Sequence, residues 1–252
     1  MTDTPAPIPQ GFLDPAPSTC QILLVRHGQS EAYTPGQPFA LVDGHGDPPL
    51  SALGEWQAVQ VGDRLRDQPI DAIYASTLTR TQQTAAPLAA HVDLDVSIEP
   101  DLREVFLGDF EGGLFRLKAA EGHPAVLAMR ESGDWGEIPG AESNEDLRSR
   151  TVAAIERIAL NHADQTVAVF CHGGVIAALL AHAAGAHAKV FRGARNGSVN
   201  HIYVHEAEWT IRTFNDASHI GPLHADTVTE SVAAALGGLP ASSTAGGVGL
   251  DA

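Results

Sequence analysis

The sequence predicts an α/β fold in which helices cover both faces of a mostly parallel sheet. Short apolar runs of strand length recur along the chain, and a helix-like pattern follows each of them. Such runs are typical of strands buried on both faces, and their alternation with helices favours parallel strand pairing. The chain has 252 residues, of which 44% are apolar and 18% charged, so one large α/β domain is admissible.

Three segments are predicted as strands of this sheet. Each is a short apolar run that a turn or a helical pattern follows. They are Ile22–Val25, Ala72–Ala75 and Val167–Phe170. Because each precedes a helical stretch, their carboxyl ends are expected at one common edge of the sheet.

The second half of the chain also carries a helix signal and a hairpin signal. Ser143 stands three residues before Asp146, as in a capping box, and apolar residues follow at helical spacing. A helix is therefore predicted to start at Ser143. Farther along, Ile202–Val204 and Trp209–Phe214 flank a short acidic turn, which predicts a late hairpin.

Composition divides the chain into one domain and two tails. Residues 1–18 are rich in proline, and residues 229–252 consist mostly of Ala, Gly, Ser and Thr, so both are predicted to be flexible. The folded unit is expected over 19–228. Within it, the segments 33–49 and 106–140 are rich in Gly, Pro and aromatic residues, which is typical of long loops and short inserted helices near a site. These two lid segments are predicted to cover it.

The charge balance restricts the partners. Fifteen Lys and Arg against 31 Asp and Glu give a formal net charge of −16, which argues against binding nucleic acid or an anionic membrane. The first residues lack the basic start and apolar run of a signal peptide, so a cytoplasmic location is expected. No feature supports a particular oligomeric state. All basic residues but Lys118 and Lys189 are arginines, the side chain suited to bidentate binding of oxyanions.

Two predicted strands end in the same pair of residues. The first continues as Arg26-His27-Gly28, and the third continues as His172-Gly173-Gly174 before a helix begins. Ligands of open α/β sheets bind at the carboxyl edge of the strands, where the free N–H groups of a helix start also attract anions. The two His-Gly motifs therefore predict one shared anion pocket.

Two further residues complete this set. Arg80 lies at the start of the helix that follows the second strand, and Glu104 lies on a loop beside the lid segments. Each residue alone is more often structural than catalytic. Together, two His, two Arg and a Glu supply a nucleophile, an oxyanion clamp and an acid, which are the groups that phosphoryl transfer requires.

With these residues the chain resembles the histidine phosphatase superfamily, in the branch of the cofactor-dependent phosphoglycerate mutases and many small phosphatases. The resemblance runs from about Gln21 to about Val204. Its motifs, in order, are Arg26-His27-Gly28, Asp47-Pro48-Pro49-Leu50-Ser51, Gly54-x-x-Gln57-Ala58, Ser76-x-x-x-Arg80-Thr81, Leu102-x-Glu104, Glu142-Ser143 and His172-Gly173-Gly174. It implies a three-layer α/β/α sandwich of the phosphoglycerate mutase-like type.

The resemblance also implies a role for each site residue. His27 would be the nucleophile that forms a phosphohistidine, and Glu104 would protonate the leaving alcohol and then help water to attack. The phosphoryl oxygens would be held by Arg26, Arg80, His172 and the start of the helix at Gly173. The implied substrate is a small phosphorylated metabolite, and no metal or other cofactor is expected.

The chain departs from the family pattern at two places. Gln29 and Tyr33 stand where the family often has Glu and Asn, so the surroundings of the phosphate site differ. After Glu104, mutases typically have Arg-His-Tyr-Gly, whereas this chain has Val105-Phe106-Leu107-Gly108. The latter is closer to the phosphatases, so hydrolysis is favoured over mutase activity, which stays as the alternative.

Residues that would contact the leaving group are harder to identify. Ser30, Phe106 and Phe110 are candidates, together with Phe115 and Trp135. The aromatic residues would form an apolar leaving-group pocket or, equally well, the core of the lid segment.

Four other interpretations of the same residues are weaker. Cys20 and Arg26 match the Cys-x5-Arg spacing of cysteine phosphatases, but the residues between them are a predicted strand rather than a phosphate-binding loop. Ser30 after Gly28 resembles part of a nucleophile elbow but lacks its second glycine. A protein that only binds a phosphate ligand would need neither His27 nor Glu104. His201, Tyr203 and His205 share a strand face but lack a further ligand for a metal.

Overall fold

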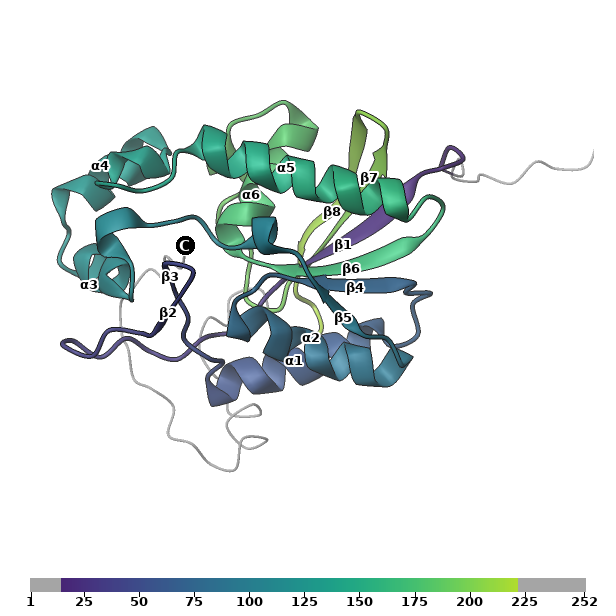
Figure 1. Ribbon diagram of the computed structural model, residues 1–252, viewed down its shortest axis with the longest axis horizontal. Helices are drawn as coiled ribbons and strands as arrows, with labels where there is room; N and C mark the ends of the chain where they lie inside the picture. Colours follow the sequence, from purple (N-terminus) through teal and green to yellow (C-terminus); the bar gives the residue numbers. More distant parts are fainter. Residues whose placement is uncertain (1–14, 222–252) are drawn as a thin grey trace, which may run out of the picture.

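A six-stranded sheet separates two layers of helices in the computed structural model, which describes residues 15–221 (Figure 1). The strand order is β5-β4-β6-β1-β7-β8. The strands are β1 Cys20–Arg26, β4 Ala72–Ala75, β5 Val96–Ile98, β6 Thr166–Cys171, β7 Val199–His205 and β8 Glu208–Asp216. Residues 1–14 of the predicted N-terminal tail, all of the predicted C-terminal tail and the end of the predicted domain beyond 221 lie outside the described residues.

The three predicted strands form the parallel centre of this sheet. β6 pairs in parallel with both β1 and β4, and β4 pairs in parallel with β5. The register sets Arg26 opposite Cys171 and Ala75 opposite Phe170, so the three strands end at nearly the same level. The residues that follow each strand therefore meet at one edge, as the sequence predicts.

The late hairpin is also confirmed. β7 lies antiparallel to β1, and β8 lies antiparallel to β7. The edge strand β5 was missed by the sequence reading because it has only three residues, two of them exposed, and carries no apolar run.

Alternate residues of β1 belong to two different cores. Ile22 and Leu24 pack in the cluster that contains Ile155 and Ile176, whereas Leu23 and Val25 pack in a second cluster with Val61 and Leu88. Successive side chains of a strand point to opposite faces, so a strand that is apolar throughout needs cover on both sides. This explains the unbroken apolar run of β1 and confirms the three layers.

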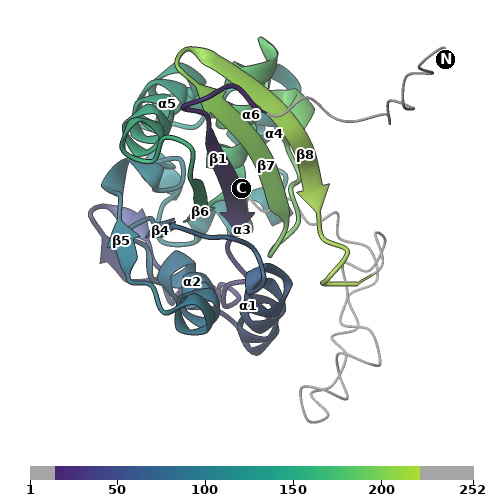
Figure 2. The same ribbon diagram turned by 90° about the vertical axis from the view of Figure 1, so that its right-hand side faces the viewer.

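The helices take their places accordingly (Figures 1 and 2). α1 and α2 cover one face of the sheet, and α5 and α6 cover the other. Their bounds are α1 Ala52–Leu65, α2 Thr79–Val92, α5 Asn144–Asn161 and α6 Gly173–Ala184. The predicted start of α5 is correct, because the Ser143 hydroxyl accepts a hydrogen bond from the Asp146 N–H at 3.1 Å.

The lid segments lie beyond the carboxyl ends of β1 and β6 (Figure 1). Residues 33–49 contain the short hairpin of β2 Leu41–Val42 and β3 His45–Gly46. Residues 106–140 contain α3 Leu114–Ala120 and α4 Pro124–Ser132, flanked by single 3-10 turns at Gly108–Phe110 and Trp135–Glu137. The short inserted helices are thus confirmed, while motion of these segments stays a prediction.

No helix among residues 15–221 is both long enough and apolar enough to span a membrane.

Candidate active site

His27 follows the last residue of β1 and is 6% exposed. Its ring Nδ1 lies 2.6 Å from the carbonyl oxygen of Gly28. Because a carbonyl oxygen only accepts hydrogen bonds, Nδ1 carries the proton and the neutral ring keeps its lone pair on Nε2. Arg80 Nε donates to this Nε2 over 3.3 Å. Nε2 is thus the nitrogen that is available to attack a phosphorus atom.

The surroundings of His27 keep it neutral. Its pKa lies well below the usual histidine range, first because the ring is buried and next because Arg80 and Arg26 are close. Burial disfavours the imidazolium ion in the same direction as a nearby positive charge, so the two effects add.

Gly28 is required by the close approach of two chain segments. A Cβ atom at this position would stand 2.4 Å from the carbonyl oxygen of Gly54, at the start of α1. The Gly28 N–H donates to the Thr84 hydroxyl of α2 at 3.0 Å. The turn that aims the His27 ring is therefore held against both helices of one layer.

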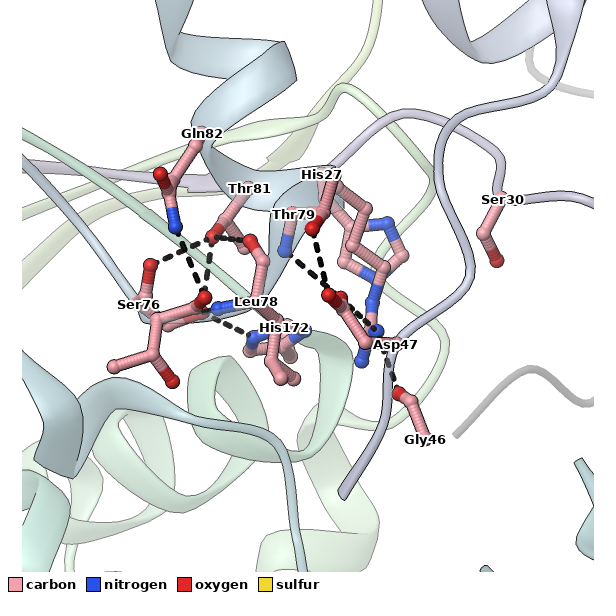
Figure 3. Close-up of polar contacts among 12 residues, drawn as sticks. His27, Ser30, Gly46, Asp47, Ser76, Leu78, Thr79, Thr81, Gln82 and His172 are labelled. Carbon is pink, nitrogen blue, oxygen red and sulfur yellow. Dashed lines mark hydrogen bonds and ion pairs between the residues drawn. The ribbon is translucent and has the colours of Figure 1, made fainter. Parts of the chain in front are cut away.

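Arg80 is fixed from the side of the β2–β3 hairpin. It lies in the first turn of α2, and its Nη1 donates to the carbonyl oxygen of Gly46 at 3.0 Å. Asp47 lies 3.9 Å from the same nitrogen and accepts hydrogen bonds from the N–H and the hydroxyl of Thr79 (Figure 3). Burial lowers the pKa of Arg80 to about 10, which still leaves it protonated at neutral pH.

Arg26, the last residue of β1, is 5% exposed and lines the same pocket as His27. Its Nη1 donates to the carbonyl oxygen of Ala194. The two arginines thus approach His27 from different elements, one from the end of a strand and one from the start of a helix.

His172 is the residue before α6, and its ring centre lies 5.1 Å from that of His27. Its Nε2 lies 2.9 Å from the hydroxyl of Ser76, which itself contacts the Thr81 hydroxyl at 2.9 Å (Figure 3). Its Nδ1 is buried and has no hydrogen-bond partner within residues 15–221. Burial, followed by Arg80 and His27, lowers the pKa of His172 well below its usual range.

Glu104 lies against the start of α6 and is 7% exposed. One carboxylate oxygen accepts from the Val105 N–H at 2.9 Å and the other accepts from the Gly174 N–H at 3.2 Å. A Cβ atom on Gly174 would stand only 2.5 Å from Glu104 Oε1, so the second glycine of the His-Gly-Gly motif makes room for this carboxylate. Each oxygen keeps a further lone pair for a proton or a water molecule.

The loop that carries Glu104 is held from outside by an ion pair. Arg150 of α5 donates from Nε and Nη2 to the two oxygens of Glu142, at 2.6 and 2.8 Å. Its remaining donors reach the carbonyl oxygens of Asp101, Arg103 and Glu104 at 2.7 to 2.9 Å. Glu142 also accepts from the Phe106 N–H at 3.2 Å. The pair therefore fixes the backbone on both sides of Glu104.

The site contains a pocket of about 680 Å³. That volume lies within the usual range for small-molecule sites. Arg26, His27, Arg80 and Glu104 form one end. The other end is lined by Tyr33 and Phe39 from the first lid segment, by Ser30, and by Phe115, Arg116 and Leu117 from α3.

The structure brings Arg26, His27, Arg80 and Glu104 together in one pocket lining, and His172 packs against the His27 ring without belonging to that lining. Gly173, the first residue of α6, is not part of the lining either.

Ser30 lines the pocket as expected. Phe106 and Phe110 do not belong to its lining: Phe106 packs on the His45 ring, and Phe110 is buried in the core with Trp135. Of the four aromatic residues from the second lid segment, Phe115 is the one that reaches the pocket.

Several lining residues were missed by sequence reasoning, among them Asn196, His45 and Arg116. Asn196 donates to the carbonyl oxygen of His27 at 2.9 Å, His45 lines the pocket from the β2–β3 hairpin, and Arg116 lines it from α3. Each comes from a loop or lid segment far from His27 in the sequence. For His45 and Arg116 the composition of the lid segments was the only signal, and it singled out neither residue; for Asn196, which lies outside both lid segments, the sequence offered no signal.

The structure also weakens two rival interpretations. Cys20 and Cys171 are buried thiols, and burial raises the pKa of Cys20 to about 12, which leaves it protonated and unreactive. Cys20 and Arg26 occupy the two ends of β1, so no loop joins them. Across residues 15–221, no three His, Cys, Asp or Glu side chains gather in a way that suits a metal ion.

Comparison with protein families gives one match over most of the chain. Residues 22–217 match the model of the histidine phosphatase superfamily (branch 1). Two relatives from Arabidopsis thaliana are each 34% identical to it. One is called phosphoglycerate mutase-like protein 4, aligned over 79% of this chain and 86% of its own. The other is called a metal-independent phosphoserine phosphatase, aligned over 79% and 83%.

Two solved structures agree with this chain in fold. The mycobacterial glucosyl-3-phosphoglycerate phosphatase superposes with a TM-score of 0.65 at 29% sequence identity, covering 78% of this chain and 99% of its own. The phosphoglycerate mutase from Bacillus anthracis superposes with a TM-score of 0.66 at 24% identity, over 81% and 96%. The predicted mutase-like sandwich is therefore confirmed.

Proposed function

The chain belongs to branch 1 of the histidine phosphatase superfamily, and from that membership and the site geometry we propose that it hydrolyses small phosphomonoesters through a phosphohistidine on His27. The observation that carries this proposal is the hydrogen bonding of the His27 ring. Nδ1 is anchored on Gly28 and Nε2 faces Arg80, so a neutral nucleophile stands beside a cation that suits a phosphoryl group.

In the first step, the lone pair of His27 Nε2 attacks phosphorus while the bond from phosphorus to the leaving-group oxygen breaks. Glu104 in its protonated form gives its proton to that oxygen, so an alcohol leaves rather than an alkoxide. Arg26, Arg80 and His172, with the backbone at Gly173, surround the phosphoryl oxygens and stabilise their charge.

In the second step, the Glu104 carboxylate accepts a proton from a water molecule whose oxygen attacks phosphorus. The bond between phosphorus and Nε2 breaks, and inorganic phosphate leaves. His27 returns to its neutral state and Glu104 returns to its protonated state, so the cycle closes without a metal or another cofactor.

The position of Glu104 supports its double role. Its carboxyl group is anchored by two backbone N–H groups, and both Glu104 and His27 line the same pocket. The residues Val105, Phe106 and Leu107 that follow it differ from the mutase pattern, so hydrolysis is favoured over transfer to a second hydroxyl. We further propose that the protein acts on a soluble metabolite and needs no nucleic acid or membrane.

A substrate panel tests the proposal. Purified protein is given p-nitrophenyl phosphate, several phosphorylated metabolites and 3-phosphoglycerate, with no added metal and with a chelator present. We expect release of inorganic phosphate and no conversion of 3-phosphoglycerate to its 2-isomer. Isomer formation would instead establish the mutase alternative. Binding of phosphate esters without any turnover would identify a protein that only binds its ligand.

A further inference from the structure

Glu111 lines the pocket from the second lid segment and has no part in the proposed chemistry. Its half-buried carboxylate accepts hydrogen bonds from three backbone N–H groups. Oε1 accepts from Leu107 at 2.9 Å, and Oε2 accepts from Gly46 at 2.7 Å and from Gly112 at 3.4 Å. A carboxylate at the wall of a phosphate pocket repels the ligand, so we expect this one to contribute in another way.

One oxygen of Glu111 fixes the side chain on its own turn. Leu107 precedes the 3-10 turn Gly108–Phe110 and Glu111 follows it. The Glu111 N–H donates to the carbonyl oxygen of Gly108 at 3.2 Å, while the side chain returns to the Leu107 N–H at the start of the turn. A side chain that bonds back in this way keeps little rotamer freedom. Oε2 is therefore held toward the β2–β3 hairpin.

The other oxygen of Glu111 holds that hairpin at Gly46. A hydrogen bond of 2.7 Å to an ionised acceptor belongs to the stronger class. A Cβ atom on Gly46 would stand 3.2 Å from the Gly112 nitrogen and 3.4 Å from Glu111 Oε2, so the glycine allows this close approach. The Phe39 N–H adds a second link between the two lid segments, because it donates to the carbonyl oxygen of Gly112 at 3.0 Å.

Gly46 in turn holds Arg80. Its carbonyl oxygen accepts from Arg80 Nη1 at 3.0 Å, and its N–H donates to Glu111 (Figure 3). Arg80 Nε lies 3.3 Å from His27 Nε2, so a displaced guanidinium would fail to meet a phosphoryl group on that nitrogen. Groups that bind a reacting centre need support to within about 0.5 Å. The contacts from Glu111 through Gly46 to Arg80 provide such support.

The second contact of Glu111, at Leu107, lies near the general acid Glu104. The Glu104 loop has a separate anchor, because Arg150 donates to the carbonyl oxygens of Arg103 and Glu104 at 2.8 and 2.9 Å. Loss of Glu111 is therefore expected to displace Arg80 more than Glu104.

We propose that Glu111 is a positioning residue of the phosphate site, which acts through Gly46 to hold Arg80 in its place. This inference rests on the proposed function, because it takes Arg80 as a ligand of the phosphoryl group. It has an unusual consequence for binding. Removal of the negative charge alone would strengthen the binding of an anion, whereas loss of the support for Arg80 weakens it. The two effects have opposite signs and can be told apart.

The first test measures the dissociation constant of inorganic phosphate by calorimetry. Glu111→Gln keeps the size of the side chain but replaces one acceptor oxygen by an NH2 group. Glu111→Asp keeps the charge but is too short to reach both Leu107 and Gly46. We expect the dissociation constant to rise about five- to twentyfold in each variant. The matched control is Glu121→Gln, which removes an exposed carboxylate after α3 that pairs with Lys118, and should change it by less than about twofold.

The second test repeats these measurements in the Arg80→Ala background. With Arg80 absent, Glu111→Gln should leave phosphate binding unchanged or make it tighter, because only a repelling charge is removed. An equal rise in both backgrounds would show a role that does not pass through Arg80. An unchanged or lower dissociation constant in Glu111→Gln with Arg80 present would also overturn the proposal. If thermal unfolding shows that Glu111→Gln is not folded, Glu111→Asp decides, with a rise expected only when Arg80 is present.

Kinetics separates this result from failure of the proposed function. Glu111→Gln should lower kcat/KM for p-nitrophenyl phosphate and for an alkyl phosphate by the same factor, and a loss confined to the alkyl phosphate would assign the effect to Glu104 and overturn the proposal. Phosphate binding needs no turnover. The expected binding pattern without any hydrolysis would therefore refute the proposed function and support the role of Glu111, whereas hydrolysis with unchanged phosphate binding would do the reverse.

Discussion

The two ends of the pocket are built in different ways. The phosphate end consists of Arg26, His27, Arg80 and Glu104, which are at most 7% exposed, and the buried His172 packs against the His27 ring. Arg26 and His27 stand at the end of a parallel strand, and Arg80 stands in the first turn of α2. The leaving-group end consists of Tyr33, Phe39, Phe115, Arg116 and Leu117, all from the lid segments. The residues proposed for the chemistry are thus placed mainly by the sheet and the helix that follows it, whereas those proposed to select the leaving group lie on loop and lid segments, the kind of segment that often carries specificity.

This difference predicts how substitutions at each end will act. Changes at the phosphate end should slow every substrate, because every substrate contains the phosphoryl group. Changes at the leaving-group end should alter the order of preference among substrates. Glu104 belongs to the phosphate end, but its proposed proton goes to the leaving group, so the effect of its loss should depend on how much the leaving group needs that proton.

Apart from substitution of the nucleophile His27, the largest effect is expected for Glu104→Gln with an alkyl phosphate. The amide cannot donate the proton that an alkoxide needs, so kcat/KM should fall about 100- to 1000-fold. For p-nitrophenyl phosphate, whose leaving group is already stable as an anion, the fall should be about tenfold or less. Steady-state kinetics on both substrates checks this, and equal slowing of the two would remove Glu104 from the acid role.

Arg80→Lys is expected to lower kcat/KM about ten- to a hundredfold for all substrates alike. Lysine keeps the charge but loses the fork that reaches both the phosphoryl oxygens and the Gly46 carbonyl oxygen. Steady-state kinetics with the alkyl phosphate and with p-nitrophenyl phosphate measures this fall in kcat/KM, and Arg148→Lys on the exposed face of α5 is the control. A rate equal to that of the wild type would place Arg80 outside the phosphate site.

Arg150 provides a test of how the Glu104 loop is positioned. Arg150→Gln removes the ion pair with Glu142 and most of the bonds to the loop carbonyl oxygens, so kcat on an alkyl phosphate should fall about tenfold. Because this residue acts through Glu104, the double variant with Glu104→Gln should be no slower than Glu104→Gln alone. Additive losses, or equal losses with activated and alkyl substrates, would show a role that does not pass through Glu104.

The smallest effect concerns pH and compares the two ends directly. Arg80 and Arg116 both lower the pKa of His27, Arg80 more strongly. Removing either charge should raise that pKa, so the acidic limb of the profile of kcat/KM against pH should move to higher pH. The shift should be larger in Arg80→Gln than in Arg116→Gln. The ionisation of the substrate contributes equally to the pH profiles of the wild type and both variants, so it does not affect the comparison. An acidic limb that stays at the same pH in both variants would mean that the protonation of His27 does not determine that limb.

The difference between the two ends of the pocket also explains which site residues can be predicted from the sequence. His27, His172 and Arg80 follow apolar runs that are recognisable as strands, and parallel strands bring their ends together without further information. The contact of Arg116 with Ser30 joins residues 86 positions apart and depends on how α3 packs over the pocket. No local pattern encodes that placement. The same holds for Asn196, which reaches the carbonyl oxygen of His27 from the loop before β7.

Aromatic residues of the second lid segment show this limit most clearly. Phe106, Phe110, Phe115 and Trp135 look equivalent in the sequence, and all were candidates for one apolar pocket or for the lid core. In the structure Phe110 and Trp135 are buried in the core, Phe106 covers His45, and Phe115 alone of the four reaches the pocket. The sequence indicates that such an aromatic residue is buried, but it does not indicate whether the side chain faces the pocket or the core of the lid segment.

The central claim is the covalent phosphohistidine on His27. The most direct measurement is rapid quenching of wild-type protein during turnover of a radiolabelled aryl phosphate, followed by mapping of the labelled peptide. We expect an acid-labile, alkali-stable phosphoryl group on His27, and no label together with a rate lowered at least about a thousandfold in His27→Ala. Label on another residue, or a His27→Ala variant that keeps a near-normal rate, would contradict the account.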